Sequence, residues 1–364
     1  MSLRLLIAGG GTGGHIFPAL AVAEQLQRGH PQSEVLFVGS ADGLEQQLVP
    51  AAGFALKTIA VGKLKGTRWA ARLTTLAGLP RATLCALRLL RQFRPDAVVG
   101  VGGYASGPVV LAAWMLRLPI VLLEQNAIPG ATNRALSRFA GRVVISYPQS
   151  ARFFPRGRTC CLGNPVRPAL VDLLREAPLP NRPPALLVLG GSQGARRLNE
   201  LVVAATPAIF AALPELQIVH QTGRADHDWV SERYRRWPTA RALPFIDEMA
   251  QAYAASQLVI SRAGATTLAE LGVAGRPALL VPYPFAADDH QTANARSLVE
   301  AGAAHLLPQD QLTGQQLAQL TIDLLRQPGE LQRMSGAMAA CGRPDAAAAV
   351  VGLLEQLRGR TGHA

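Results

Sequence analysis

Three short glycine-rich segments stand where apolar runs end and helix-like segments begin. They read GGGTGGH (9–15), GGYASG (102–107) and GGSQGA (190–195). Glycines leave backbone N–H groups accessible, and the helix that follows offers its positive end, so such a turn can hold a phosphate group. A single glycine turn is also typical of a plain strand-to-helix connection. Three of them in one chain favour binding of a phosphorylated ligand.

The first of these segments also has the spacing of a dinucleotide-binding turn. Gly9, Gly11 and Gly14 satisfy G-x-G-x-x-G between an apolar run and a helix-like segment. Dinucleotide binding further needs an acidic residue at the end of the second strand, where it holds the ribose. That strand ends here in the letters VGS at 38–40. The sequence therefore favours phosphate binding over NAD binding.

His15 closes the first glycine-rich segment, immediately before the expected helix. The positive end of a helix favours the neutral imidazole, and a neutral imidazole can act as a general base near neutral pH. The alternative is a structural histidine hydrogen-bonded within the turn, since most lone histidines are not catalytic. The residue by itself leaves both roles open.

The segment SRAGATTLAE (261–270) follows another apolar run and carries groups that suit a nucleoside diphosphate. The small residues at 264–265 allow close approach of a diphosphate, and the threonines at 266–267 can cap the helix or bind phosphate oxygens. Glu270 can accept hydrogen bonds from the two vicinal hydroxyls of a ribose, although it is also an ordinary acid near a helix start. Further charge and a hydroxyl come from Arg262, Arg167 and Ser192.

Asp226 and Asp228 form a D-x-D pair, which holds a metal ion in some sugar-transfer enzymes. Carboxylates two residues apart are common by chance, and this pair stands among polar and basic residues. We expect a solvated loop here and no metal site, because glycine turns and arginines can neutralise a diphosphate without a metal.

Apolar runs alternate with helix-length segments, and the pattern starts again near residue 185. Expected strands lie at 3–9, 34–39, 96–103, 119–126, 142–147, 185–194, 216–223, 242–245, 257–264 and 278–284, and expected helices include 18–27 and 345–357. This alternation is typical of a parallel sheet with helices on both faces. We expect an α/β protein of two doubly wound, Rossmann-like domains facing across a cleft, with ligands beyond the C-terminal ends of the strands.

Length and composition agree with two folded domains. The chain has 364 residues, of which 49% are hydrophobic and 16% charged, and this excludes a disordered protein. Four cysteines without a C-x-x-C pair fit a reducing compartment and argue against structural zinc. The apolar start is too short for a signal peptide, and the run 109–123 is interrupted by Arg117 and Pro119, so we expect a soluble chain without a spanning helix.

The net charge of +12 lies entirely in the first half of the chain. Residues 1–164 hold 18 basic and 6 acidic residues, whereas residues 165–364 hold 18 of each. From 46 to 95 there is no acidic residue, and nine basic ones occur between Lys57 and Arg94. Such a field attracts nucleic acid, an anionic membrane or a phosphorylated substrate, and the plain alternative is a solvated basic face.

Around 81–94, helical spacing groups Leu84 and Leu87 with Arg88, Arg91 and Arg94 on one face. With the nearby Trp69 and Trp114, this face suits a lipid headgroup interface.

Taken together, the motifs resemble one family over about residues 3–345. They are GGGTGGH-F-P (9–18), GGY-SGP (102–108), EQN (124–126), GNPVR (163–167), GGSQGAR (190–196), FID-M (245–249), SRAGA-T-E (261–270) and HQ--NA (290–295). In this order they resemble the MurG family of bacterial glycosyltransferases. The resemblance implies the two-domain GT-B fold and transfer of N-acetylglucosamine from UDP-N-acetylglucosamine to the muramoyl 4-hydroxyl of lipid I. The expected product is lipid II, with inversion at the anomeric carbon and a β-1,4 link.

The resemblance also implies roles for individual residues. His15 is then the catalytic base. Ile246 offers its backbone to uracil, Glu270 binds the ribose, and Gln291 contacts sugar hydroxyls. The diphosphate is held by Ser192, Arg167, Arg262 and the helix start Ala265, Thr266, Thr267, Leu268 and Ala269. Residues implied to reach the donor sugar from the other domain are Thr12, Gly13, Gly14 and Asn126, and those implied to face the acceptor are Gly102, Gly103, Tyr104 and Glu124.

The restart of the strand–helix pattern places the domain boundary near 163–168. We expect an acceptor- and membrane-facing domain at 1–163, a UDP-sugar domain at 164–340, and a C-terminal helix at 341–364 that packs back on the first domain. The resemblance further implies a peripheral position on the cytoplasmic side of the inner membrane, contacts with cell-wall synthesis and division proteins, and no cofactor. Many members carry histidine before EQN, where this chain has Leu123, so no role is assigned to that position.

Two rival functions stay open on the sequence alone. A UDP-sugar 2-epimerase of the same fold would keep the nucleotide domain but lack a basic, membrane-facing one. A nucleic-acid-binding protein would explain the charge. We expect no nucleic-acid partner, however, because the chain lacks a recognisable nucleic-acid motif and has only 5% aromatic residues for base stacking.

Overall fold

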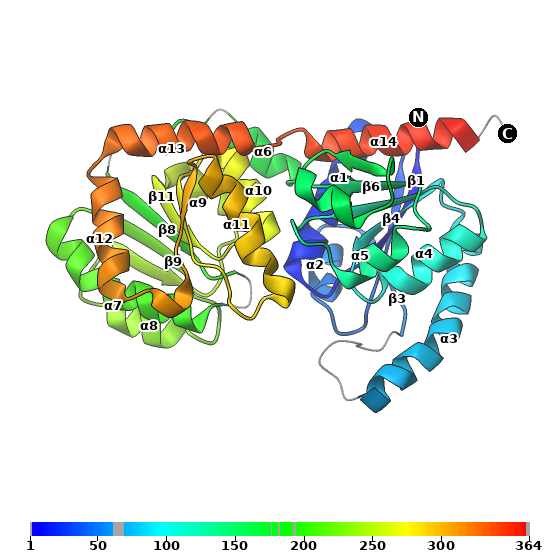
Figure 1. Ribbon diagram of the computed structural model, residues 1–364, viewed down its shortest axis with the longest axis horizontal. Helices are drawn as coiled ribbons and strands as arrows, with labels where there is room; N and C mark the ends of the chain where they lie inside the picture. Colours follow the sequence, from blue (N-terminus) through cyan, green and yellow to red (C-terminus); the bar gives the residue numbers. More distant parts are fainter. Residues whose placement is uncertain (1, 61–68, 176, 181–182, 192–193, 362–364) are drawn as a thin grey trace. The chain divides into compact units, whose positions relative to one another are not determined.

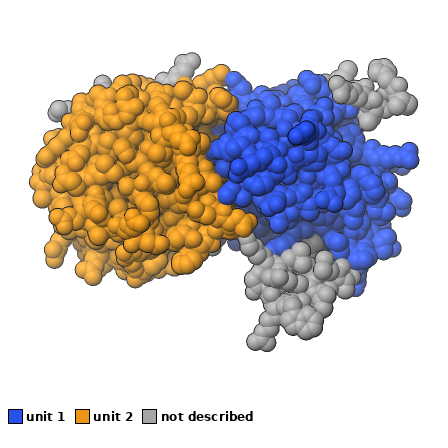
Figure 2. Space-filling model, viewed as in Figure 1, with its two compact units in different colours: residues 1–168, 345–364 blue, residues 169–344 orange. Residues whose placement is uncertain are grey.

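The chain folds into two compact units, each built on its own parallel sheet. The computed structural model describes residues 2–60, 69–175, 177–180, 183–191 and 194–361. Unit 1 comprises residues 1–168 and 345–364, and unit 2 comprises residues 169–344 (Figure 2). The divisions predicted from sequence, after residues 163 and 340, fall slightly earlier in the chain.

Unit 1 contains a seven-stranded sheet in the order β3-β2-β1-β4-β5-β6-β7, with every neighbouring pair parallel. Figure 1 shows the helices and strands of the chain as a ribbon. Its strands are β1 (Arg4–Gly9), β2 (Glu34–Gly39), β3 (Ala55–Thr58), β4 (Ala97–Gly102), β5 (Ile120–Glu124), β6 (Arg142–Ile145) and β7 (Thr159–Cys161). Its helices are α1 (Gly13–Gly29), α2 (Glu45–Ala51), α3 (Trp69–Phe93), α4 (Ser106–Met115), α5 (Ala131–Leu136), the 3₁₀ helix η1 (Pro148–Phe153) and α14 (Ala346–Thr361).

Alternating side chains of β1 explain why this sheet is covered on both faces. Leu5 and Ile7 point into a core that includes α1, whereas Leu6 and Ala8 point into a second core that includes α3 and α4. Successive residues of a strand face opposite sides of the sheet, so a strand that is apolar throughout must be covered on both faces. The C-terminal helix α14 packs against α1 and contributes Val350 to the first core.

Unit 2 contains a six-stranded parallel sheet in the order β10-β9-β8-β11-β12-β13. Its strands are β8 (Ala185–Leu189), β9 (Gln217–Gln221), β10 (Ala240–Leu243), β11 (Leu258–Ser261), β12 (Ala278–Leu280) and β13 (Ala304–Leu306). Its helices are α6 (Pro168–Leu174), α7 (Arg196–Ala212), α8 (His227–Tyr234), α9 (Met249–Ala255), α10 (Ala265–Ala274), α11 (His290–Glu300), α12 (Gly314–Leu325) and α13 (Pro328–Cys341), with 3₁₀ helices η2 (Ala287–Asp289) and η3 (Gln309–Gln311). The predicted pair of doubly wound α/β domains is therefore confirmed.

Both sheets reverse their strand order at the first strand of the unit. In unit 1 the chain runs outward from β1 to β3 on one side and from β4 to β7 on the other, and unit 2 repeats this around β8 and β11. Ligands of doubly wound sheets bind beyond the C-terminal ends of the strands at such a reversal. The turns after β1 and β4, and those after β8 and β11, are therefore where each unit can form a site.

One described stretch, Pro328–Arg358, is long and apolar enough by length and composition alone to cross a bilayer. The most apolar 18-residue window within it has a mean hydropathy of 1.3, and 39% of that window is buried. The stretch consists of two helices, α13 and α14, which are separated at 342–345 and place apolar side chains such as Met338 and Leu354 in the interior. A single stretch of this kind is weak evidence for a membrane span.

Candidate functional site: the strand-end turns of the two units

The glycine turns after β1 and β4 lie directly against each other in unit 1. A Cβ atom placed on Gly9 would collide with the carbonyl oxygen of Gly102, and one on Gly103 would come within 2.6 Å of the carbonyl oxygen of Gly10. Ser106 joins the two turns, because its buried hydroxyl lies 2.7 Å from the carbonyl oxygen of Ala8 and accepts from the N–H of Gly102 at 3.2 Å. The glycines are required for this contact, and the two turns form one surface.

A buried carboxylate supports the first glycine turn from below. Glu45, at the start of α2, is 1% exposed and accepts hydrogen bonds from the N–H of Gly11 at 2.7 Å and from the N–H and hydroxyl of Ser40. A Cβ on Gly10 would lie 2.5 Å from that carboxylate. Burial alone would raise the pKa of Glu45, but these hydrogen bonds outweigh burial and lower it. Sequence reasoning missed Glu45, because its partners lie on other segments.

His15 lies in the first turn of α1, which begins at Gly13, five residues before the predicted start at Pro18. Its Nδ1 is 3.2 Å from the carbonyl oxygen of Gly10 and 3.3 Å from the hydroxyl of Thr12. A carbonyl oxygen only accepts, so the first contact requires the proton on Nδ1 and leaves the lone pair on Nε2. A Cβ on Gly102 would lie 3.0 Å from Nε2, so this nitrogen faces the turn after β4.

The segment after β5 is organised around the carboxylate of Glu124, which is 3% exposed. One oxygen accepts from the backbone N–H of Asn126 at 3.0 Å and from its side chain, and the other accepts from Gly130 and from the side chain of Asn133. Burial outweighs these bonds and raises the pKa of Glu124. A carboxylate that accepts from four donors is suited to holding the loop in shape. It places Asn126 just beyond the C-terminal end of β5, at the same end of the sheet as the glycine turns.

In unit 2, Gln221 connects the turn after β8 with the segment that contains Ile246. Its side-chain amide donates to the carbonyl oxygen of Gly191 at 3.1 Å and accepts from the N–H of Ile246 at 3.0 Å. Ser192, predicted to hold a phosphate, lies outside the described residues. The N–H of Ile246 is engaged by this bond. The carbonyl of Ile246 is therefore the backbone group that we expect to contact uracil. Gln221 has no local sequence signal, since its two partners are distant along the chain.

Helix α10 begins at Ala265, directly after β11, and carries the predicted diphosphate and ribose residues. Thr266, Thr267, Leu268 and Ala269 form its first turns, and the hydroxyl of Thr266 is buried without a hydrogen-bond partner. Glu270 follows on the same helix and accepts a hydrogen bond from the phenol of Tyr253 at 2.9 Å. The N-terminus of α10 thus stands at the strand-order reversal of unit 2, where a diphosphate can meet its N–H groups.

The predicted phosphate-binding arginines are engaged within the protein. Arg262 donates to the carbonyl oxygens of Val281 and Pro282 and to the side chain of Gln309, and its burial lowers its pKa to about 10. Arg167 belongs to unit 1 and makes a bidentate ion pair with Glu24, the shortest N–O distance being 2.6 Å.

The predicted sugar contact, Gln291, lies on α11 next to the segment that Arg262 supports. Its side chain accepts from the N–H of Tyr283 at 2.9 Å. Arg262 and Gln291 therefore both hold the backbone at 281–283. This segment follows β12 and lies at the C-terminal ends of the strands, as the start of α10 does.

The D-x-D pair is only half solvated. Asp228 is fully exposed, as predicted, whereas Asp226 is buried and accepts from Arg196 at 2.7 Å, from Trp229 and from Asn199. The expectation of a solvated loop is wrong for Asp226, because this carboxylate joins α7 to α8. Among the described residues no group of three or more His, Cys, Asp or Glu side chains is arranged to hold a metal ion.

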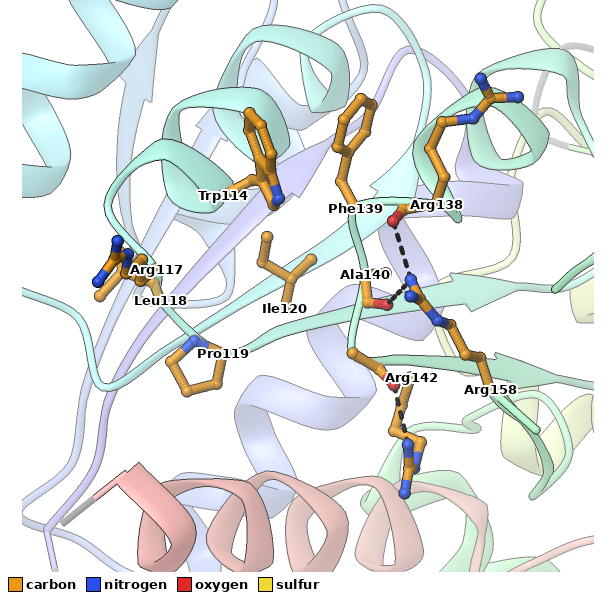
Figure 3. A pocket seen from close by; sticks show the side chains of 11 residues that line it. Trp114, Arg117, Leu118, Pro119, Ile120, Arg138, Phe139, Ala140, Arg142 and Arg158 are labelled. Atoms are coloured by element: carbon orange, nitrogen blue, oxygen red, sulfur yellow. Dashed lines mark hydrogen bonds between the residues drawn. The ribbon is translucent and has the colours of Figure 1, made fainter. Parts of the chain in front are cut away.

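A hollow of about 460 Å³ lies at the N-terminal ends of β5 and β6, whereas the glycine turns follow the C-terminal ends of β1 and β4. Figure 3 shows the side chains that line it. The rings of Trp114 and Phe139, 5.1 Å apart, form its apolar part. Basic side chains line it as well, namely Arg117, Arg138, Arg142 and Arg158. Arg158 donates to the carbonyl oxygens of Arg138 and Ala140, so it also closes the end of α5. The hollow combines an apolar surface with positive charge.

Helix α3 packs against α4, the helix that carries Trp114. Leu84 is exposed together with Arg88 and Arg91, as expected of the helix face that was predicted to combine leucines with arginines. The placement of Leu87 on that face is wrong, because this side chain lies one turn before the buried Leu90 and joins it in the core. Residues 61–68 and the side chain of Trp69 lie outside the described part of the chain.

Comparison with known proteins agrees with this arrangement. Residues 5–145 match the glycosyltransferase family 28 N-terminal domain, and residues 185–350 match the family 28 C-terminal domain. The UDP-N-acetylglucosamine--N-acetylmuramyl-(pentapeptide) pyrophosphoryl-undecaprenol N-acetylglucosamine transferase of Anaeromyxobacter dehalogenans strain 2CP-1 is 48% identical over 99% of this chain and 94% of its own length.

Solved structures extend the comparison to the fold. The crystal structure of Acinetobacter baumannii MurG has 34% identity and a TM-score of 0.77, covering 97% of this chain and 99% of the other. A UDP-GlcNAc 2-epimerase from Neisseria meningitidis has a TM-score of 0.70 over 97% of this chain and 100% of its own, but 15% identity, so it shares the fold alone. The chain therefore belongs to the MurG family of glycosyltransferases and has its two-domain GT-B fold.

Proposed function

We propose that this chain transfers N-acetylglucosamine from UDP-N-acetylglucosamine to the muramoyl 4-hydroxyl of lipid I, giving lipid II with inversion and a β-1,4 link. The observation that carries this proposal is the 48% identity over 99% of the chain to a transferase named for that reaction. Glycine turns and helix N-termini at both strand-order reversals supply the anion-binding chemistry that the reaction needs.

The transfer requires one base and a stabilised leaving group. The acceptor oxygen attacks the anomeric carbon, the bond from that carbon to the UDP oxygen breaks, and UDP leaves with the bonding electrons. We assign the proton of the attacking hydroxyl to Nε2 of His15, since the contact of Nδ1 with Gly10 leaves the lone pair on Nε2. The positive end of α10 stabilises the charge that develops on the departing diphosphate.

The donor is held mainly by unit 2 in this proposal. Glu270 binds the ribose hydroxyls, and the backbone at Ile246 contacts uracil. Arg262 is assigned to the diphosphate and Gln291 to the sugar hydroxyls, and both also hold the backbone at 281–283 by hydrogen bonds. The diphosphate is assigned to Ser192, Arg167 and the helix start at Ala265, Thr266, Thr267, Leu268 and Ala269.

The sugar and the acceptor are assigned to the joined turns of unit 1. Thr12, Gly13, Gly14 and Asn126 are the proposed contacts of the donor sugar. Gly102, Gly103 and Tyr104 are the proposed contacts of the acceptor diphosphate. Glu124 acts on the acceptor through the loop that it holds, because its carboxylate is buried and accepts four hydrogen bonds.

A basic and aromatic surface of unit 1 is proposed to hold the protein peripherally on the cytoplasmic side of the inner membrane. This surface comprises the exposed side of α3 and the hollow around Trp114. Aromatic rings beside arginines suit the headgroup region, where the ring enters the apolar boundary and the cation meets lipid phosphate. Cell-wall synthesis and division proteins are further expected partners on the membrane.

The test is incubation of the protein with UDP-N-acetylglucosamine and a soluble lipid I analogue, followed by mass spectrometry. We expect the analogue to gain one N-acetylhexosamine residue and UDP to be released. Conversion of the UDP-sugar without an acceptor would instead indicate a 2-epimerase. Salt-sensitive DNA binding without transfer would indicate a nucleic-acid-binding protein. Either outcome would overturn the proposal.

A further inference from the structure

We propose that Tyr253 is a positioning residue for donor recognition, whose phenol fixes the carboxylate of Glu270 for the ribose. This inference rests on the proposed function, in which Glu270 contacts the ribose hydroxyls. It assigns a role to the side chain that holds Glu270, and so it concerns how the protein selects a ribonucleoside diphosphate.

The contact itself joins two neighbouring helices of unit 2. Tyr253 lies on α9 and is 0% exposed, and its hydroxyl donates to Oε2 of Glu270 on α10 at 2.9 Å. Glu270 is only partly buried, so one end of this pair is reachable from solvent and the other is enclosed. A carboxylate oxygen has two lone pairs, so it can accept from the phenol and from a ribose hydroxyl together.

The proton of this bond stays on the phenol across the working range of pH. Burial, followed by the nearby charge of Glu270 and the hydrogen bond to it, raises the pKa of Tyr253 well above its usual value. The phenol therefore keeps the proton that it donates to the carboxylate of Glu270. Hydrogen bonds to an ionised acceptor are shorter and stronger than neutral ones, so this contact suits a role in orientation.

The backbone of Tyr253 is itself anchored by a buried cation. Arg276 is 1% exposed and donates from Nε to the carbonyl oxygen of Tyr253 at 2.7 Å, and from its terminal nitrogen to that of Pro178 at 3.0 Å. Ser256 donates to the same carbonyl of Tyr253 at 2.9 Å. Burial lowers the pKa of Arg276 to about 10, which leaves it charged at neutral pH. A tyrosine held at its backbone can hold Glu270 with its side chain.

This chain of contacts predicts a specific defect. In Tyr253→Phe the ring still fills its space, but Glu270 loses one hydrogen bond that holds its rotamer. More of the freedom of this side chain must then be given up when the donor binds. We expect UDP to bind about tenfold more weakly, the scale of one hydrogen bond to a charged group. The donor KM should rise while kcat stays near wild type, because the ribose lies away from the bonds that change.

The experiment is a double-mutant cycle read by calorimetry with UDP as the probe. Tyr253→Phe, Glu270→Ala and the double variant are compared with wild type, and each is checked for folding by thermal unfolding. If Tyr253 acts through Glu270, the phenylalanine substitution weakens binding in the wild-type background and changes nothing further in Glu270→Ala. Binding of 2′,3′-dideoxy-UDP, which lacks both ribose hydroxyls, should be the same for wild type and Tyr253→Phe.

The matched control is Tyr234→Phe, which removes another buried phenol of unit 2, hydrogen-bonded to His220. It should leave UDP affinity unchanged. Wild-type UDP affinity in Tyr253→Phe, or an equal loss in both backgrounds and with the dideoxy probe, would overturn the role of Tyr253. Wild-type UDP affinity in Glu270→Ala would overturn the ribose contact itself, so the two failures are distinguishable.

Discussion

The N–H of Gly11 donates to the carboxylate of Glu45 at 2.7 Å, although 34 residues separate them in the chain. The same carboxylate accepts from Ser40, so it ties the turn after β2 to the turn after β1. This N–H is consequently engaged within the protein, and the helix start at Gly13 and Gly14 is left as the anion-binding part of the turn. The shape of the surface around His15 thus depends on a side chain that is itself enclosed.

The first prediction concerns this buried carboxylate. Glu45→Gln replaces one acceptor oxygen by an NH₂ group that cannot accept from Gly11 or Ser40. We expect the free energy of unfolding to fall by about 1–3 kcal/mol, the cost of a buried donor left unsatisfied. Urea unfolding measures this loss, and kcat should fall with it because the turn before His15 loses its support.

The control for this variant is Glu34→Gln at the start of β2. Glu34 pairs with Arg4 across an exposed surface, a class of ion pair that contributes about 0–1 kcal/mol. UDP affinity should stay unchanged in both variants, since the donor is assigned to unit 2. Equal stability and kcat of Glu45→Gln and wild type would remove the supporting role of Glu45.

The sequence predicted the inner strands well and the outermost ones poorly. Strands such as β1 and β4 are buried on both faces and are therefore apolar throughout, which makes them visible as runs. The strands missed altogether are β3, β7 and β13, and each is the edge strand of its sheet. An edge strand meets solvent, so short segments such as ALKT and TCC carry no apolar run.

A similar division applies to the candidate site. Glycine turns and His15 are readable in the sequence because their signal is local. Glu45, Gln221 and Tyr253 are not, because each acts on a residue 17 to 34 positions away. The role of Arg262 as a phosphate ligand stays a prediction, and its hydrogen bonds to residues 19 or more positions later in the chain had no local sequence signal.

The second prediction concerns the membrane surface of unit 1. Replacing Arg88, Arg91 and Arg94 together by Gln should weaken binding to vesicles that contain anionic lipid, by about 1 kcal/mol for each charge near the surface. Sedimentation with vesicles of rising anionic content measures this binding, and a repeat at high salt measures its electrostatic part, because salt screens the charges. Trp114→Ala should weaken binding to anionic and neutral vesicles alike, because it removes apolar contact.

A triple substitution of exposed arginines in unit 2 serves as the control. Arg233, Arg235 and Arg236 are exposed on and after α8, and their replacement by Gln removes the same charge. It should leave vesicle binding close to wild type. Equal loss in both triple variants would mean that net charge alone attracts the protein, and would overturn the assigned surface.

The third prediction concerns stability in acid. His220 is fully buried between Tyr234 and Asn199, and burial lowers its pKa to about 3, although the charge of Asp226 opposes this. The unfolded chain takes up this proton below about pH 6.5, whereas the folded chain does so only near the lowered pKa. Between these values the free energy of unfolding should fall by about 1.4 kcal/mol for each pH unit of acidification.

Comparison of pH slopes isolates this histidine. His220→Asn removes the titration, so its stability should depend less steeply on pH between about 6.5 and 3 than that of the wild type. Urea unfolding at a series of pH values supplies the slopes. Identical slopes for His220→Asn and wild type would contradict the prediction.

The last prediction concerns His15 as the base. Its Nε2 carries the lone pair and faces the turn after β4, where the acceptor is assigned. A positioned base contributes about 10²–10⁴-fold, so His15→Ala should lower kcat by that factor and leave UDP affinity unchanged. His15→Asn can still donate to Gly10 but offers no basic nitrogen, so it should preserve the turn and lose activity as well. His30→Ala, at the other end of α1 where its Nε2 lies 2.6 Å from the carboxylate of Glu355, is the matched control and should keep wild-type kcat. The measurement is kcat on a soluble lipid I analogue, with folding checked by circular dichroism. Near wild-type kcat in His15→Asn would reduce His15 to a support of the turn, and would move the search for a base to the neighbouring loop at Asn126.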